Sequence, residues 1–269
     1  METKKANNKK AYNGISAAIV ILACFIIAVC FYQFVLGNPA NFMDNNPANH
    51  PLPGNYFGTV YKGGYIGPVV ITLFLTVVTL SIERMIAIGR SKGRKNLVKF
   101  VQTIKKDLEE GNLDAAHKLC SEQKGSVANV VNAALSRYSD VESSSRQTKE
   151  QKILIIQKDI EESTALELPS MEQNLPVIAT ISTLGTLFGL LGTVLGMIRS
   201  FAALANAGAP DSVALSTGIS EALVNTALGI ATGALAIISY NYFTSKIDNI
   251  TYAIDEIGFS IVQTFAAKH

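Results

Sequence analysis

The sequence predicts an all-α, polytopic membrane protein with four transmembrane helices, a helical cytoplasmic domain and long helices that extend into the cytoplasm. Hydrophobic residues make up 48% of the 269 residues, charged residues make up only 16%, and tryptophan is absent. A soluble domain of this length normally has a smaller apolar share and more charge. The apolar residues also gather into long stretches that polar segments separate. This pattern is typical of a chain that crosses a bilayer several times.

The first apolar stretch covers residues 15–36 and follows an N-terminal segment, residues 1–14, that we expect in the cytoplasm. The stretch contains no charged residue, and at about 1.5 Å per residue it can cross a hydrocarbon core of about 30 Å. A cleavable signal peptide is the alternative. Signal peptides have a shorter apolar region that ends at small residues, whereas this stretch continues through Phe31, Tyr32 and Phe34. We therefore expect a retained transmembrane helix.

The second span is expected at residues 65–88, after a periplasmic loop at residues 37–64. The loop is rich in Asn, Pro and Gly, which favour irregular structure. Basic residues indicate the orientation, because short cytoplasmic loops retain an excess of Lys and Arg. They lie before the first span, at Lys4, Lys5, Lys9 and Lys10, and after the second, at Arg90, Lys92, Arg94, Lys95 and Lys99. Both of these flanks are therefore expected in the cytoplasm.

A helical cytoplasmic domain is expected at residues 89–174. Helical periodicity is interrupted at Gly111 and Asn112 and again at Gly125 and Ser126, which predicts short helices with turns between them. Residues 141–150 are rich in Ser, Glu and Lys, so they are expected to form a turn or connection. A long helix is expected to start near residue 151 and to lead back to the membrane.

The third and fourth spans are expected at residues 175–204 and 213–243. The turn between them, residues 205–212, contains no Lys or Arg and is short enough to force an antiparallel hairpin. We expect this turn in the periplasm and the tail, residues 244–269, in the cytoplasm, so that both termini are cytoplasmic. Arg199, near the outer end of the third span, is an exception to this distribution of basic residues.

Glu221 is the most informative charged residue, because it lies well inside the fourth span. A charge at bilayer depth costs about 2.5 to 3.5 kcal/mol, so an intramembrane carboxylate normally marks a proton or ion pathway. Burial favours the neutral carboxyl group, which we expect to gain and lose a proton. At about 100° per residue, Thr217 and Asn225 lie about 40° on either side of Glu221, and Thr232 and Ser239 continue this polar face. The alternative is a protonated Glu221 that only bonds a neighbouring helix.

Small and polar residues form a stripe along the third span: Ser182, Thr186, Gly189, Thr193, Gly196 and Ser200. If this stripe faces the polar side of the fourth span, the two could form a narrow hydrated route. Glycines at GxxxG spacing also permit close helix packing, and we prefer that interpretation for the glycines. For the threonines, the alignment with Glu221 favours the route.

Two segments together carry a family resemblance. Residues 189–201, GLLGTVLGMIRSF, are followed by SEALVNTALGIATGALAI at residues 220–237. This pair resembles the paired-helix signature of the MotA/TolQ/ExbB proton-channel family, and the chain looks most like the ExbB branch. The chain departs from the family pattern in two places: the additional span at residues 15–36, and Leu235, where the family often has a proline.

The resemblance implies roles for three residues. It places the proton carrier at Glu221 and implies that Thr193 and Thr226 line the channel. The helical wheel puts Thr226 about 140° from Glu221, which would let Thr226 face another helix at a subunit boundary. Thr217 and Asn225 join this expected proton pathway because they lie on the polar face beside Glu221.

The resemblance also implies an assembly. This chain is expected to form a homo-oligomeric ring, with a pentamer as the family expectation, around an ExbD-like or TolR-like single-span partner in the bacterial inner membrane. An ExbB-like role, in which the proton motive force energises TonB-dependent outer-membrane transport through a TonB-like protein, is preferred to a TolQ-like role in envelope maintenance. A non-conducting membrane scaffold and a secondary transporter are the alternatives from other classes, although the repeated halves typical of transporters are not evident. One carboxylate per subunit favours protons over sodium.

Other functions have little support in the sequence. A net charge of +2 and the lack of a long basic stripe disfavour nucleic-acid binding. The chain has no G-x-x-x-x-G-K-[ST] phosphate loop, which disfavours an ATP-driven motor. Its cysteines and histidines are scattered and offer no metal-ligand spacing. We therefore expect neither an enzyme nor a bound cofactor, and we expect membrane lipid as a partner of the four spans.

Overall fold

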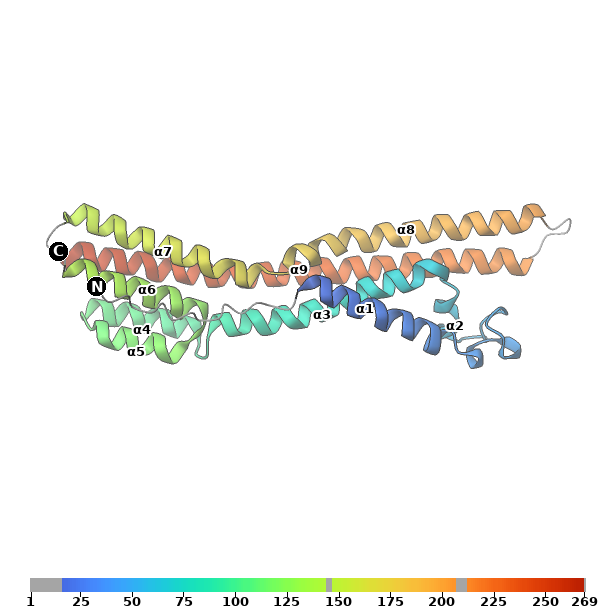
Figure 1. The fold of residues 1–269 in the computed structure, drawn as a ribbon, viewed down its shortest axis with the longest axis horizontal. Helices are drawn as coiled ribbons and strands as arrows, with labels where there is room; N and C mark the ends of the chain where they lie inside the picture. Colours follow the sequence, from blue (N-terminus) through green and yellow to red (C-terminus); the bar gives the residue numbers. More distant parts are fainter. Residues whose placement is uncertain (1–15, 144–146, 207–211, 269) are drawn as a thin grey trace, which may run out of the picture. The chain divides into compact units, whose positions relative to one another are not determined.

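The computed structural model describes residues 16–143, 147–206 and 212–268, and the regular elements there are helices (Figure 1). Four of these helical stretches are long and apolar enough to cross a membrane, as the sequence predicts. The chain divides into two compact units. We call residues 15–82 and 174–241 the transmembrane unit, and residues 1–14, 83–173 and 242–269 the bundle unit.

The transmembrane unit takes its helices from four places in the chain. α1 is Ala17–Phe31 and is extended by a π-helical turn at Tyr32–Leu36, α3 is Gly67–Lys92, α8 is Leu175–Asn206 and α9 is Ser212–Lys268. One face of α1 buries Val20, Cys24 and Ala28. The other face exposes large apolar side chains such as Ile19 and Leu22, which suits contact with lipid tails.

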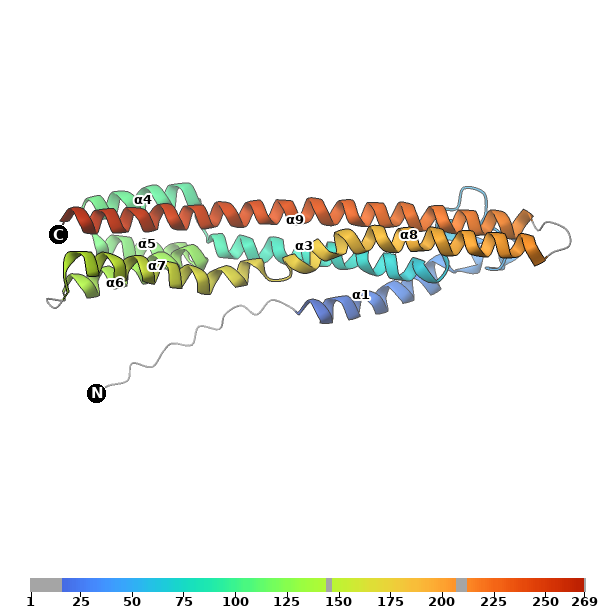
Figure 2. The same cartoon turned by 90° about the horizontal axis from the view of Figure 1, so that it is seen from above.

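Within the transmembrane unit, α8 and α9 run side by side (Figures 1 and 2) because glycines let their backbones approach closely. A Cβ on Gly189 would lie 3.0 Å from the Cα of Gly229, and a Cβ on Gly196 would lie 2.7 Å from the carbonyl oxygen of Gly218. Ser200 lies on the same stripe and is fully buried. The glycines of α8 thus pack directly against α9, as preferred for the glycines from the sequence.

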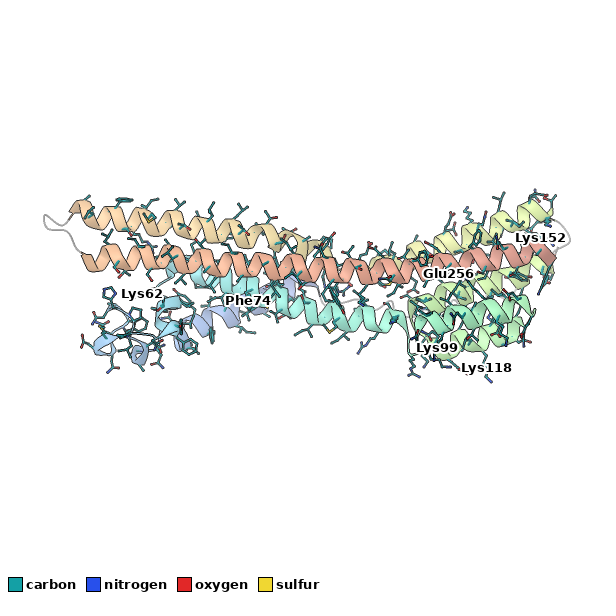
Figure 3. All side chains as sticks on the ribbon, turned by 180° about the vertical axis from the view of Figure 1, so that it is seen from behind. Lys62, Phe74, Lys99, Lys118, Lys152 and Glu256 are labelled. Carbon is teal, nitrogen blue, oxygen red and sulfur yellow. The ribbon has the colours of Figure 1, made fainter. Side chains whose placement is uncertain are left out.

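The loop between α1 and α3, expected to be irregular, contains short helices. They are 3-10 turns at Pro39–Asn41, Met43–Asn45 and Gly64–Ile66, and α2 at Tyr56–Tyr61. The Lys62 ammonium donates to the carbonyl oxygens of Pro47 at 2.9 Å and Ala48 at 3.0 Å, and it lies 5.6 Å from the centre of the buried Phe42 ring. These contacts give the loop, in which Figure 3 labels Lys62, a compact structure of its own.

The bundle unit contains four further helices together with the ends of α3 and α9. The four are α4 at Leu97–Glu109, α5 at Leu113–Gln123, α6 at Gly125–Glu142 and α7 at Lys149–Glu172. α4 ends just before Gly111 and α6 begins at Gly125, so the helices are interrupted where the sequence indicates turns. Residues 244–269, expected as a tail, continue α9 as far as Lys268. Ile257 and Phe265 are fully buried, so this end of α9 is part of the bundle core.

Arg84 is fully buried in the bundle unit. Its guanidinium pairs with the neighbouring Glu83 and donates from Nη1 to the carbonyl oxygens of Ser170 at 3.2 Å and Met171 at 3.3 Å. Both carbonyls belong to the last turn of α7, where carbonyl groups lack partners within the helix. Arg84 therefore caps the end of α7, and its charge is compensated without contact with water.

Candidate functional site

Glu221 of α9 forms an ion pair with Arg199 of α8. Arg199 Nη1 donates to Glu221 Oε1 at 2.6 Å. Glu221 is 6% exposed, whereas the Arg199 side chain is 45% exposed. Within the described helical parts of the transmembrane unit, these two residues carry the only charged side chains of α1, α3, α8 and α9. The pair therefore concentrates the whole fixed charge of these helices at one place.

The hairpin of α8 and α9 explains how the two charges meet. Arg199 lies toward the end of α8, and Glu221 lies near the start of α9, so antiparallel packing brings them to a similar depth. From the sequence we interpret Arg199 only as an exception to the distribution of basic residues, and we miss this pair. The sequence signal that could have indicated the pair is the position of two opposite charges at similar distances before and after the turn between the third and fourth spans.

Gly64 closes the site from the side of the loop. Its φ is +64°, a conformation that only glycine adopts readily, and a Cβ at this position would collide with Glu221 Oε1. The same Cβ would lie 2.9 Å from Arg199 Nη1. The backbone of the loop therefore lies directly against the ion pair, in a space that a larger residue would not fit.

Two tyrosines support this closure. The Tyr32 hydroxyl, at the end of the first span, donates to the Gly64 carbonyl oxygen at 2.8 Å and also contacts the Tyr61 carbonyl oxygen. The Tyr65 ring centre lies 5.3 Å from the Arg199 guanidinium carbon, within range of a cation–π interaction. The loop and the first span thus contribute to a site whose charges come from the last two spans, a role that the sequence did not indicate for either.

Asn225, predicted from the polar face, lies one turn after Glu221 and is fully buried. Its Nδ2 donates to the carbonyl oxygen of Gly63 at 2.8 Å. Its Oδ1 has no hydrogen-bond partner among the described residues. An unsatisfied buried amide oxygen can accept a bond from water or from a protonated group. Asn225 therefore both anchors the loop and leaves an acceptor beside Glu221.

Thr193 and Thr226, which the family resemblance assigns to the channel, hydrogen-bond to each other across α8 and α9. The Thr226 hydroxyl also lies 3.0 Å from the Ala222 carbonyl oxygen, and both hydroxyls lie 3.3 Å from the Gly189 carbonyl oxygen. Thr226 faces α8 of its own chain. The pair lies on the seam between the two helices, while Asn225 faces the loop.

Thr217 lies in a different setting, at a small recess of about 240 Å³ between the loop and the start of α9. The recess is also lined by His50, Lys62 and Ser220. Ser220 immediately precedes Glu221 in the chain. Of the five predicted site residues, Glu221, Asn225 and Thr217 border the loop, whereas Thr193 and Thr226 lie between the helices.

The ion pair links α8 and α9 through the charge of Glu221. While Glu221 is ionised, its charge compensates that of Arg199. Once Glu221 gains a proton, that attraction is lost, and the Arg199 charge is left without its carboxylate partner. Arg199 is partly exposed and can then turn to another partner. Gain or loss of one proton would therefore change the contacts of α8.

Comparison with known proteins points to one family. The profile of the MotA/TolQ/ExbB proton channel family matches residues 122–256. The Tol-Pal system protein TolQ of Haemophilus influenzae is 33% identical over 84 residues, which are 31% of this chain and 37% of that protein. The biopolymer transport protein ExbB of Salmonella typhimurium is 29% identical over 85 residues, 32% of this chain and 35% of that protein.

A longer match is to a biopolymer transport protein ExbB homolog of Methanothermobacter thermautotrophicus, 26% identical over 204 residues, 72% of this chain and 66% of that protein. The chain spans less than two thirds of the length of each of these relatives. The family match includes α8 and the part of α9 with Glu221, while the loop with Gly64 lies outside it. With half of its residues matched, this chain belongs to the MotA/TolQ/ExbB proton channel family.

Proposed function

We propose that this chain is the proton-conducting subunit of an inner-membrane motor and that Glu221 is its proton carrier. One observation carries this proposal: a buried carboxylate is paired with a half-exposed arginine, and the described parts of α1, α3, α8 and α9 in the transmembrane unit carry no other charged side chain. A carboxylate in such surroundings costs free energy, and its presence there therefore indicates a role in proton or ion transfer. Membership of a proton channel family supports the same conclusion.

In the proposed cycle, a proton from the periplasmic side neutralises Glu221 and releases Arg199. Loss of the proton to the cytoplasm restores the ion pair. Moving one charge through 100 mV supplies about 2.3 kcal/mol, which is enough for a modest change in helix contacts. Each proton would therefore shift α8 and α9 between two arrangements of the same side chains.

The remaining predicted residues take two positions in this pathway. Thr217, at the recess beside the loop, and Asn225, with its unsatisfied oxygen, lie where a proton or water would approach Glu221 from the loop. Thr226 lies further along α9 and hydrogen-bonds to Thr193 of α8 across the seam, and this pair would continue the pathway toward the other side. The proposed order is thus recess, Glu221, then the threonine pair.

The proposed assembly is a homo-oligomeric ring, a pentamer, that surrounds an ExbD-like or TolR-like single-span subunit. Both termini would lie in the cytoplasm, in accordance with the basic residues that flank the first two spans. An ExbB-like role in energising TonB-dependent transport through a TonB-like protein is our first choice, and a TolQ-like role in envelope maintenance is the second. Relatives with both names support the shared mechanism and do not distinguish the two roles.

A non-conducting scaffold is the competing function, and the tight packing around the ion pair favours it. Gly64, Tyr65 and Tyr32 enclose the pair as they would enclose a purely structural one. In a scaffold, Glu221 and Arg199 would only hold α8, α9 and the loop together. The two functions differ in what happens when Glu221 loses its ability to ionise.

Proton flux into liposomes that contain the protein with its co-purified single-span partner distinguishes the two functions. Glu221→Gln preserves shape and hydrogen bonding but cannot ionise, and we expect flux to fall to background while the ring still assembles. Glu122→Gln, which removes an exposed carboxylate of the bundle unit, is the matched control and should conduct normally. Full flux in Glu221→Gln would overturn the proposal in favour of the scaffold.

A further inference from the structure

A groove of about 660 Å³ crosses the bundle unit between the end of α3, the start of α4 and α9. Its floor is apolar and buried, and consists of side chains such as Ile88, Val101 and Phe243. Its rim includes large apolar side chains that are open to the outside, namely Met85, Val98 and Tyr252, which are 60%, 64% and 71% exposed. Its volume and its apolar lining thus suit a hydrocarbon chain.

The groove is also positively charged. Lys92 and Lys246 line it, and neither has a carboxylate partner among the described residues. The Lys246 ammonium lies 5.3 Å from the centre of the Tyr242 ring, which is also at the groove. The one acidic lining residue, Glu256, is already paired with Lys105 at 2.5 Å. Two uncompensated lysines therefore remain for a ligand.

The groove lies where two apolar runs end. In α3 the uncharged run stops at Glu83, and in α9 it stops at Lys246. Side chains just beyond the end of a span lie at the level of the lipid headgroups, where lysines and tyrosines are favoured. At this level a lysine can reach lipid phosphate groups, and an apolar floor suits acyl chains.

We propose that this groove binds one anionic phospholipid. Its phosphate would lie between Lys92 and Lys246, and an acyl chain would lie along Ile88 and Phe243. Basic pockets between helices at this level favour anionic headgroups. The charge and the apolar floor together favour a lipid over a soluble anion, which would leave the apolar walls uncovered, and over a second copy of this same basic surface.

Native mass spectrometry of the full-length protein in detergent tests the proposal, with added phosphatidylglycerol or phosphatidylcholine of identical acyl chains. We expect phosphatidylglycerol to be retained preferentially. One lysine near an anionic headgroup changes affinity about five-fold, so Lys92→Gln with Lys246→Gln should weaken retention roughly 30-fold. Lys99→Gln with Lys118→Gln, on exposed positions of α4 and α5 (Figure 3), is the matched control and should retain the lipid.

Equal retention of the two lipids, or equal losses in the two double variants, would overturn the proposal. A photo-crosslinking residue at Tyr252, on the rim, provides an independent readout that does not depend on the lysines. We expect it to capture lipid, whereas the same residue at Phe259, exposed on α9 outside the groove, should not do so selectively. Capture of a second copy at Tyr252 in place of lipid would identify the groove as a subunit interface and would contradict the proposed lipid site.

Discussion

The Cβ that any residue other than glycine would carry at position 64 points into the carboxylate of Glu221. Gly64 is in the loop between the first two spans, and Glu221 is in the last span. Their contact means that the environment of the proposed proton carrier depends on a segment outside the part of the chain that matches the family. Residues far from each other in sequence thus share one site.

Gly64→Ala is expected to disturb the ion pair. The positive φ alone would destabilise the variant by about 1 to 2 kcal/mol, and the collision with Glu221 should add about 1 to 3 kcal/mol. Gly54→Ala is the matched control, because Gly54 has a φ of +78° but open space around its Cβ position. Thermal unfolding in detergent and proton flux should both show a larger loss for Gly64→Ala. Equal losses in the two variants would contradict a special contact with Glu221.

Arg199→Gln should destabilise the transmembrane unit by about 1 to 3 kcal/mol, because it leaves the buried Glu221 carboxylate without its ion-pair partner, while the 45% exposure of Arg199 limits the loss. The double variant with Glu221→Gln removes both charges and should recover most of that stability without recovering flux. Unfolding of the wild type, both single variants and the double variant gives the coupling free energy. Strictly additive effects would show that the two residues do not interact in the folded protein.

Thr226→Val should reduce proton flux, because it keeps the shape of the side chain but removes the hydroxyl that bonds Thr193. Its effect on stability should be about 1 kcal/mol, as expected for one lost hydrogen bond, and Thr226→Ser should conduct. The matched control is Thr232→Val, since the buried Thr232 hydroxyl bonds only the Leu228 carbonyl of its own helix. If both valine variants conducted equally, the threonine pair would have no part in the pathway.

The reactivity of the buried Cys120 thiol measures whether the bundle unit is folded. Burial raises the pKa of its thiol to about 12, so at pH 8.5 the folded protein should react with maleimide roughly 1000-fold more slowly than an unfolded chain, whose cysteine titrates near 8.5. Because the folded pKa is the higher one, the associated stability is present below pH 8.5 and is lost as pH rises toward 12. The rate of maleimide labelling of Cys120 can be measured, with and without denaturant, in a variant that carries Cys24→Ser and Cys30→Ser. Similar rates in both conditions would show that Cys120 is not protected.

The sequence was sufficient for the all-α fold class and the four apolar spans, because long uncharged stretches are local signals. It also identified Glu221, since an isolated carboxylate in an apolar run stands out without any neighbour. The turns at Gly111 and Gly125 were predictable for the same reason, as glycine changes the backbone locally. The continuation of α9 to Lys268 was not predicted, because its apolar residues need the other helices of the bundle unit to be buried.

The partners of Glu221 were decided by the tertiary structure alone. Arg199 looked like an exception to a charge rule, and Gly64 looked like one glycine among many in a loop. Their roles depend on an antiparallel register and on a loop that packs against α9, and both are set by contacts between segments that are distant in sequence. The sequence by itself determined that one carboxylate, Glu221, lies within the apolar part of the last span. The folded chain decided which charge balances it and which backbone closes around it, because only packing brings α8, α9 and the loop to the same point.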